Sequence, residues 1–276
     1  MKFRTAFLSA FFISIVGFSV TATAQESPTQ PGLLAAGGFL DNPNPDVVIG
    51  VGAGASYRNS YFGSSETELV PTGLFRINYL RFKNGFEFGS TRSVGFREGV
   101  TFSGAARYIS ERDSNDYKEL TGLNSVNWTM ELGLGLGYEQ RDWRVFGDAR
   151  YGFFGHHGFV GQLGADVIGR PIKGLTLTLG PRMDFGDEQF TQTYFGITPA
   201  EAAASRFSAY SPGGGLVSAG LLFDAQYQID ERWGLEGQVA WNRYLGDAAN
   251  SPITQYGSTD QFQVKLLITR RISLDF

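Results

Sequence analysis

The stretch VNWTMELGLGLGYE, residues 126–139, decides the fold because its apolar and polar side chains alternate at every position. The even-numbered residues are apolar, and the odd-numbered residues are polar, acidic or glycine. Successive side chains of a β-strand point to opposite faces, whereas a helix would distribute both sets around its axis. The stretch therefore predicts a long β-strand whose apolar face is bracketed by Trp128 and Tyr138.

The same alternation recurs along the chain from Val47 to the last residue. The predicted strands are 47–57, 71–82, 85–97, 99–109, 126–139, 142–154, 158–169, 174–186, 189–195, 216–229, 233–244 and 262–276. An even number of strands is what bacterial outer-membrane barrels have. Most of these strands are also longer than the roughly five or six residues that are usual in globular sheets.

A soluble β-sandwich also alternates, but it buries its apolar rows between two sheets. In this sequence aromatic residues stand at the ends of the apolar rows, where membrane interfaces favour them. The chain offers no apolar run of helical spanning length after its N-terminus, and lipid admits only helices or closed sheets. We therefore predict an all-β fold, a transmembrane antiparallel up-and-down β-barrel of about 12 strands, in preference to a sandwich.

One hairpin register follows from the same pattern. If Arg141 and Asp142 form a two-residue turn, Glu139 lies opposite Arg144 on the polar face, and the apolar faces also coincide. A three-residue turn would mix the two faces, because a shift of one residue moves every side chain to the other side. The sequence predicts the two-residue turn.

The composition excludes several classes of function. The 276-residue chain contains no cysteine and has a formal net charge of −4. The absence of cysteine excludes thiolate metal sites, thiol catalysis and disulfides. The acidic balance disfavours a nucleic-acid partner, which a basic domain would suit. The combination of 37 Gly with 24 Phe and 12 Tyr is unusual for a soluble enzyme.

The chain divides into three parts. Residues 1–24 carry a positive start, an apolar core and the sequence Ala22-Thr23-Ala24, and so predict a cleaved signal peptide. Residues 25–46 are rich in Pro, Gly and Asn and predict an extended periplasmic arm. Residues 47–276 are the predicted outer-membrane barrel.

The predicted loops leave one question open. With both ends of the chain in the periplasm, the long connections 58–70, 196–215 and 245–261 lie outside the cell, as expected for such barrels. The connection 110–125 is also long and polar, yet the twelve-strand count makes it periplasmic. Either a strand is miscounted, or this periplasmic loop is enlarged. Within 196–215, the residues from Thr198 to Glu201 form a capping box followed by one or two helical turns.

We predict no catalytic, cofactor-binding or metal-binding residues. His156 and His157 are the two histidines, and we interpret them as part of a solvated, glycine-flanked turn. A serine hydrolase would need a serine and a third residue to orient the ring. Two histidines are also too few for a catalytic zinc site, which normally takes three protein ligands.

Two other sequence patterns are weak indications of a binding site. Gly50, Gly52 and Gly54 imitate part of a dinucleotide fingerprint, but they lie inside a predicted strand rather than between a strand and a helix. Asp113 and Asp116 belong to a polar segment that lacks the glycine and distal glutamate of a calcium loop. We interpret the glycines as small lumen-facing residues and the acidic segment as a solvated loop.

Arginine is far more frequent than lysine, and several arginines share polar rows with carboxylates. These arginines and their candidate partners are Arg107, Arg144, Arg150 and Arg182 beside Glu131, Asp148, Asp166 and Asp184. Pairs of this kind across a narrow lumen would lock the barrel, because guanidinium and carboxylate groups bind each other in a bidentate manner. The alternative is a constriction for solutes lined by opposite charges.

Three stretches and the last residue carry a resemblance to a known family. The stretches are GLFRINY (73–79), YFGITPAEAAAS (194–205) and YLGDAANSPI (244–253), and the chain ends in Phe276. With these residues the chain resembles the MipA/OmpV outer-membrane proteins over nearly the whole mature sequence. The resemblance implies an outer-membrane barrel of Gram-negative bacteria, with no catalytic residues and no cofactor.

The resemblance also implies partners. The family is named after a protein that interacts with a murein-degrading lytic transglycosylase, which it joins to a peptidoglycan synthase. We therefore expect a non-enzymatic scaffold embedded in outer-membrane lipid, whose arm 25–46, and with it 110–125, contacts the periplasmic partner. A passive channel for small solutes and a surface adhesin remain alternatives. We also expect the alternating row that ends in Phe276 to be the signal for barrel assembly.

Overall fold

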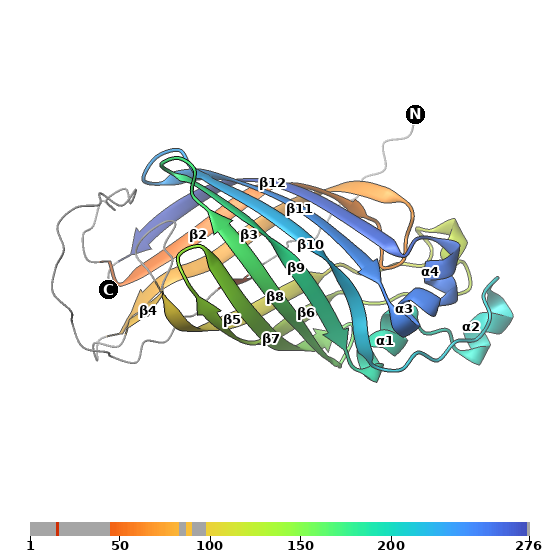
Figure 1. Cartoon of the computed structure of the whole chain (residues 1–276). Helices are drawn as coiled ribbons and strands as arrows, with labels where there is room; N and C mark the ends of the chain where they lie inside the picture. The colour runs from red at the N-terminus through yellow and green to blue at the C-terminus, as the bar shows by residue number, and fades with distance from the viewer. Residues whose placement is uncertain (1–14, 17–44, 83–86, 90–97, 275–276) are drawn as a thin grey trace, which may run out of the picture.

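The computed structural model describes residues 15–16, 45–82, 87–89 and 98–274. Within these residues a single antiparallel sheet curls into a barrel, and short helices gather at one of its ends (Figure 1). Nearly all of the predicted leader 1–24 and of the arm 25–46 lies outside the described residues, as do most of the predicted strand 85–97 and Phe276.

The described sheet contains ten long strands and two short ones. The long strands are β2 (Val47–Asn59), β3 (Thr67–Arg81), β5 (Gly99–Ile109), β6 (Thr129–Glu139), β7 (Trp143–Phe154), β8 (Phe159–Gly169), β9 (Leu175–Gly186), β10 (Gly215–Gln228), β11 (Trp233–Tyr244) and β12 (Asp260–Leu274). The short strands are β1 (Ile15–Val16) and β4 (Glu87–Gly89). The sheet order is β1-β5-β6-β7-β8-β9-β10-β11-β12-β2-β3-β4. The predicted all-β, antiparallel barrel fold is confirmed, with "about 12" as an approximate strand count.

The two ends of the sheet meet near β1. This short strand pairs with Ala105 and Ala106 of β5 and also contacts β3. β1 belongs to the predicted leader, so cleavage of residues 1–24 would remove it.

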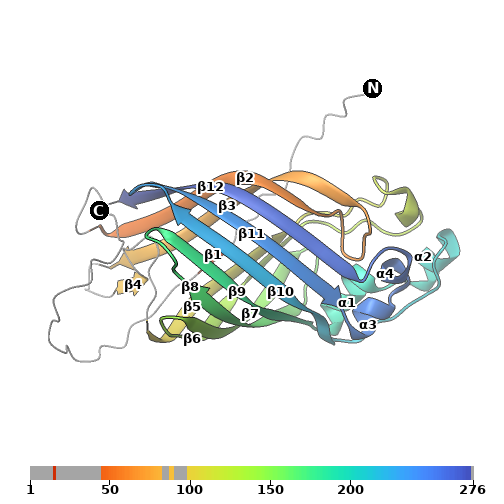
Figure 2. The same ribbon diagram turned by 45° about the horizontal axis from the view of Figure 1, so that its top comes forward.

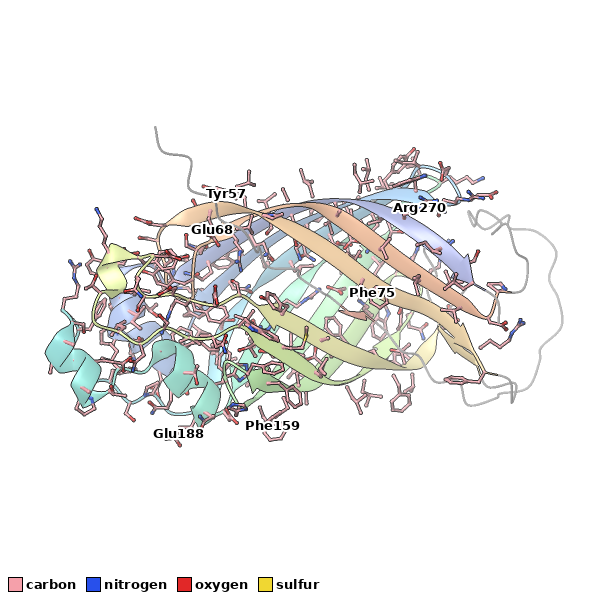
Figure 3. All side chains as sticks on the ribbon, turned by 180° about the vertical axis from the view of Figure 1, so that it is seen from behind. Tyr57, Glu68, Phe75, Phe159, Glu188 and Arg270 are labelled. Atoms are coloured by element: carbon pink, nitrogen blue, oxygen red, sulfur yellow. The ribbon has the colours of Figure 1, made fainter. Side chains whose placement is uncertain are left out.

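Exposure alternates along the strands as the sequence predicts. In β6, Leu134 is 76% exposed, whereas Glu131, three residues earlier, is 0% exposed. In β12, Leu266 is exposed and the adjacent Lys265 is buried. Because the apolar rows face outward and the polar rows face inward, this sheet has the inverse of a soluble core, as a lipid-embedded barrel requires. Figure 3 shows side chains projecting from both faces of the sheet.

Aromatic side chains cluster near both ends of the outer surface. Trp128 stacks on Tyr108 at 5.9 Å between ring centroids and lies 4.3 Å from the ring of Phe154. At the opposite ends of β6 and β7, Tyr138 and Trp143 lie 5.8 Å apart. These two groups match the aromatic girdles that flank the apolar band of outer-membrane barrels.

The predicted hairpin register between β6 and β7 is confirmed. Glu139 pairs with Arg144 and Tyr138 pairs with Val145. The turn closes with a hydrogen bond from the Gln140 N–H to the Trp143 carbonyl oxygen at 2.8 Å. The need to keep apolar faces together was sufficient to fix this register.

The predicted strand 189–195 is wrong, because these residues form the helix α1 (Glu188–Phe195). The side chain of Asp187 caps this helix by accepting a hydrogen bond from the Phe190 N–H. The buried residues Phe190, Thr191, Tyr194 and Phe195 recur at helical spacing and lie on one face. The periodicity of such a short run of aromatic and β-branched residues fits a strand as well as a helix. The side chain of Asp187, which caps the first turn, favours the helix.

The barrel has two unlike ends. The turn end carries the short connections 140–142, 170–174 and 229–232. The loop end carries the connections 60–66, 110–128, 155–158, 187–214 and 245–259. Asp46 lies at the turn end with the end of β12, because its N–H donates to the Leu274 carbonyl oxygen at 3.0 Å.

This arrangement corrects the sidedness of 110–125. Gly99, at the start of β5, pairs with Glu139 beside the 140–142 turn, and Ile109 pairs with Thr129 at the opposite end. The connection 110–125 therefore lies at the loop end, with the other long loops. Of the two alternatives from the sequence, a miscount of strands is the correct one. Between β3 and β5 the described residues form only the short strand β4 rather than a full strand 85–97, and 189–195 is a helix.

Short helices gather at the loop end (Figure 2). Besides α1 they are α2 (Pro199–Ala204), α3 (Gly246–Asn250), α4 (Pro252–Tyr256) and the 3-10 helix η1 (Lys118–Leu120). The predicted capping box is confirmed: Thr198 and Glu201 satisfy each other's backbone N–H groups at the start of α2. No helix of the described residues has both the length and the apolar character needed to cross a membrane.

Candidate functional site in the barrel lumen

A plug built on α1 fills the lumen at the loop end. Phe190, Tyr194 and Phe195 of α1 pack in one cluster with lumen-facing side chains from opposite parts of the barrel wall, among them Val160 of β8 and Tyr244 of β11. The Tyr244 ring meets the Phe195 ring at 5.1 Å, edge to face. Since the contacts come from several strands, α1 lies across the mouth rather than beside it.

Hydrogen bonds fix the plug to the wall and to the loops. The hydroxyl groups of Tyr194 and Thr129 lie 2.9 Å apart. The Ser251 hydroxyl donates to the Phe195 carbonyl oxygen at 2.7 Å, and Arg112 donates from Nη1 to the Tyr194 carbonyl oxygen at 3.0 Å. Burial lowers the pKa of Arg112. The C-terminal carbonyl groups of α1 thus find partners from two different loops, as buried helix ends require.

Directly beneath the plug, Glu131 is the centre of a buried charge network. Arg107 donates from Nε and Nη2 to the two carboxylate oxygens at 2.8 and 2.6 Å. Arg150 donates from Nε to Oε2 at 3.0 Å and also pairs with Asp148. Arg107 and Glu131 are direct register partners on β5 and β6. The predicted Arg–carboxylate pairs are confirmed here, and Arg107 has the bidentate geometry that makes such pairs strong. The pairs join neighbouring strands, however, rather than reaching across the lumen as predicted.

His156 joins this network, which corrects its interpretation as a solvated residue. Its side chain is 1% exposed, whereas His157 is exposed as predicted. The Gly158 N–H donates to Nδ1 at 3.2 Å, so in the neutral ring the proton lies on Nε2, which donates to Glu131 at 3.1 Å. The ring fits because residue 152 is glycine, where a Cβ atom would lie 2.2 Å from its Cε1.

A second charge cluster lies nearer the turn end, around Asp166. Arg144 donates from Nε to Oδ2 at 2.7 Å, and Nη1 of Arg182 lies 2.7 Å from Oδ1. Both guanidinium groups contact the Phe146 ring, with distances of 5.3 and 4.9 Å from their Cζ atoms to the ring centroid. Gly164 accommodates this ring, because a Cβ atom there would meet it at 2.4 Å. Cation–π contacts and ion pairs together hold the wall in one arrangement.

Asp184 departs from the predicted pairing with arginine. Gln162 donates to its Oδ1 at 2.9 Å, and the Ser218 hydroxyl donates to its Oδ2 at 2.7 Å. Asp184 therefore connects β8 and β10 across β9. Gln162 and Ser218 lie on the inward rows of their strands, as Asp184 does. The alternation therefore placed Asp184 on the correct face, and only the identity of its hydrogen-bond donors differs from the prediction.

The loops at the loop end bind one another. The Tyr61 hydroxyl donates to Glu119 at 3.0 Å, and its ring meets the Tyr117 ring at 4.9 Å. Burial raises the pKa of Tyr117 to about 12. The Asn124 N–H donates to Glu201 at 2.8 Å, which joins the connection 110–125 to α2.

The Glu201 carboxylate also accepts from the Thr198 N–H at 2.8 Å. Burial favours its neutral form, but the N–H donors of Asn124 and Thr198 favour the anion more, so the pKa of Glu201 is below its ordinary value.

The weak patterns have structural roles. The glycines at 50, 52 and 54 lie inside β2, on its lumen-facing row. Asp113 accepts from the Asn115 N–H at 3.0 Å and from the Ser125 hydroxyl at 2.9 Å, and the Asn115 donor lowers the pKa of Asp113. In the part of the chain that the structure describes, no three His, Asp or Glu residues are grouped as metal ligands would be.

At the turn end the lumen holds a feature that sequence reasoning missed. A cavity lies beside the β10–β11 turn and is bordered by Gly50, Leu74, Glu236, Thr269 and Arg271, among others. Arg271 follows the inward row of β12, which runs through Gln263, Lys265 and Leu267. The alternation could have placed Arg271 in the lumen. Ile268 and Ile272 belong to the apolar, outward row of this strand, and Arg271 is an odd number of residues from each, so it belongs to the inward row.

Apolar outward rows, charged inward rows and aromatic groups at both ends define a membrane-embedded β-barrel with a plugged lumen. A family model described as "MltA-interacting protein MipA" matches residues 51–272. The chain belongs to this family, as the sequence resemblance implied, and it is an outer-membrane β-barrel protein. No curated protein matches the chain.

Matches of low similarity were found among solved structures. Neisserial surface protein A matches with 10% identity and a TM-score of 0.26, over 83% of this chain and 97% of that chain. A bacterial polysaccharide outer membrane secretin matches with 8% identity and a TM-score of 0.39, over 83% and 99%. A variant of OccD1 (OprD) matches with 9% identity and a TM-score of 0.25, over 86% and 97%.

Proposed function

We propose that the protein is a non-enzymatic scaffold that binds a murein-degrading lytic transglycosylase and a peptidoglycan synthase at the periplasmic side of the outer membrane. The family description, "MltA-interacting protein", supports the first partner. The second partner rests on the resemblance of the sequence to that family. Neither role needs a catalytic residue in this chain.

The orientation that we propose has the turn end in the periplasm. Outer-membrane barrels have short periplasmic turns and longer extracellular loops. The connections 140–142, 170–174 and 229–232 are short, whereas every connection longer than ten residues among the described ones is at the loop end. Asp46, where the predicted arm 25–46 ends, is also at the turn end. The arm and the three turns then form the docking surface, and 110–125 does not belong to it.

The single observation that carries the proposal is the closed loop end. The α1 plug fills the mouth of the lumen and packs against side chains of several strands. Beneath it, the two arginine–carboxylate clusters tie neighbouring strands together on the inward face, β5 to β6 and β7 to β8. A mouth closed in this way favours a structural role over the passage of solutes. The exposed surface available for a periplasmic partner is then the rim of the turn end.

Site-specific photo-crosslinking in cells tests the scaffold. A photoreactive amino acid is introduced at Arg141, Lys173 or Glu231, one in each short turn, and at Ala203 of α2 as the loop-end control. We expect a lytic transglycosylase of the MltA type to be captured from the turn positions and not from Ala203. Capture of only outer-surface neighbours, or no capture from any turn, would contradict the proposal.

A passive channel is the second candidate, because charged side chains line the lumen as they do in selective pores. Planar-bilayer recording on the purified, refolded protein separates the two functions. The scaffold predicts silent bilayers, since the plug is held by buried contacts. Steady unitary conductance would favour the channel and count against the plugged scaffold.

A further inference from the structure

Arg271 differs from the other arginines of the lumen. Arg107, Arg144, Arg150 and Arg182 each have a carboxylate oxygen within 3.0 Å. Arg271 is only 8% exposed, yet neither Nη1 nor Nη2 has a hydrogen-bond partner among the described residues. Burial of a guanidinium group without an acceptor is unfavourable, because the charge loses its hydration and gains no hydrogen bond in exchange. A buried cation of this kind calls for an anion.

The local backbone leaves room beside this guanidinium group. Arg271 is held in the wall by its N–H, which donates to the Arg232 carbonyl oxygen at 2.7 Å. Its register partner on β2 is Gly50, which has no side chain to fill the space. Both residues border the cavity at the β10–β11 turn. Both Nη atoms are covered in this structure, so a ligand in the cavity reaches them when the Arg271 side chain turns toward it. Arg271 and the cavity together form one site at the turn end.

The size of the cavity suits a small polar group. It measures about 70 Å³, and one water molecule needs roughly 10–15 Å³ on the same scale. The space is therefore sufficient for a carboxylate or a similar oxyanion together with a small group attached to it.

The charges around the cavity favour a monoanion. Its border includes three carboxylates, Asp230, Glu231 and Glu236, and three guanidinium groups, Arg232, Arg270 and Arg271. Arg270 is the residue that lies over the outer face of the Trp233 ring, at 5.1 Å, so its charge is directed away from the lumen. A phosphate dianion would add two negative charges beside three carboxylates, whereas a carboxylate would add one.

The geometry points to a carboxylate-binding site: we propose that the two free Nη groups of Arg271 bind the carboxylate of a small solute or of a peptide terminus in this cavity. A planar guanidinium group presents two parallel N–H donors that match the two oxygens of a carboxylate. The site goes beyond the proposed scaffold role and does not depend on it, because it requires only the barrel wall at the turn end.

Fluorine NMR on the folded full-length mature protein in detergent micelles tests the site, with trifluoroacetate as the carboxylate probe at neutral pH. We expect saturable line broadening for the unaltered protein. Arg271→Gln should weaken binding by about tenfold or more, since a hydrogen-bonded charge pair contributes about 1.5–3 kcal/mol. Arg271→Lys keeps the charge but loses the fork, so it should fall between the two.

Arg270→Gln is the matched control, because it removes the same charge one residue away, on the outer face of β12. Its affinity for trifluoroacetate should stay within about twofold of the unaltered protein. Heat-modifiable mobility on gels verifies that each variant is folded, and Arg271→Lys keeps the test decisive if Arg271→Gln does not fold. Competition with inorganic phosphate is measured at constant ionic strength.

Four outcomes would overturn the proposal. The first is the absence of saturable broadening in the unaltered protein. The second is equal broadening in Arg271→Gln or, should that variant not fold, unchanged affinity in Arg271→Lys. The third is displacement of the probe by phosphate at concentrations below those of the probe, because it would assign the site to phosphate groups instead. Equal weakening by Arg270→Gln and Arg271→Gln would likewise point to general charge attraction.

Discussion

The two ends of this barrel are made from the same ten long strands, yet they differ in almost every physical respect. At the loop end, Glu131 and Phe195 are both 0% exposed, and both carboxylate oxygens of Glu131 accept hydrogen bonds. At the turn end, short turns border a cavity, and the two Nη groups of Arg271 have no hydrogen-bond partner among the described residues. In Figure 3 the labelled residues Glu188 of α1 and Arg270 of β12 mark the loop end and the turn end of the barrel.

The difference teaches that strand alternation and closure have separate causes. Alternation makes the wall, because lipid selects apolar outward rows and leaves the inward rows polar. Closure comes from the long loops, whose helices bring aromatic side chains into the mouth. The barrel is therefore closed where its loops are long and open to a ligand where they are short.

The largest expected effect comes from the charge network beneath the plug. Glu131→Ala leaves Arg107 and Arg150 buried without their shared carboxylate, so the free energy of unfolding should fall by about 3–5 kcal/mol. Urea unfolding in micelles, followed by tryptophan fluorescence, measures the loss. Glu139→Ala is the control on the same row of β6 at the turn end, with an expected loss below about 1 kcal/mol. Equal losses would contradict the contrast between the ends.

The plug itself should be next in order. Phe195 is fully buried, and Phe195→Ala should lower the free energy of unfolding by about 3 kcal/mol through the cavity that it leaves. The control is Phe159→Ala on the outer surface, where the side chain is exposed and the loss should be about 1 kcal/mol or less. The same urea titration compares them. A larger loss at Phe159 would mean that α1 is not a packed plug.

A double-mutant cycle sharpens the position of His156. Gly152→Ala brings a Cβ atom to 2.2 Å from the imidazole ring, so we expect a loss of about 1–3 kcal/mol from overpacking. In the His156→Ala background the same substitution should cost at least about 1 kcal/mol less, because the clashing ring is gone. Additive losses in the unfolding titrations would show that the ring does not occupy this space.

The smallest effect is a pH dependence at the loop end. The folded-state pKa of Glu201 is lowered, so its stabilising effect is complete above the unfolded value, about 4.3, and is lost as the pH falls through the lower folded value. We expect protection of the Asn124 amide against hydrogen exchange, corrected for intrinsic rates, to decrease below about pH 4. In Glu201→Gln the Asn124 amide should be weakly protected at every pH, without a decrease below about pH 4. A step of equal size in Glu201→Gln would assign the titration to another group.

The sequence predicted the wall well and the closure poorly. The register of Glu139 with Arg144 followed from the alternation, and the capping box at Thr198 followed from residue types at fixed spacing. The helix α1 did not, because a seven-residue aromatic run fits either period and only Asp187 indicates a cap.

The candidate sites show the same limit. Arg107 and Glu131 could be matched because both lie on inward rows of neighbouring strands. The burial of His156 could not be predicted, since it depends on α1 lying over the 155–158 turn, a tertiary contact. The unpaired state of Arg271 also depends on which neighbours are glycine across the sheet.

The central claim is that outward rows contact lipid while inward rows face an enclosed lumen. Since the chain contains no cysteine, single cysteines can carry spin labels on β12 in lipid vesicles, at Val264, Leu266 and Ile268 outward and at Gln263 and Thr269 inward. We expect collision rates with dissolved oxygen to alternate, high at the three outward sites and low at the two inward sites. Uniformly low oxygen accessibility at all five sites, as in a soluble two-layer sandwich, would contradict the claim.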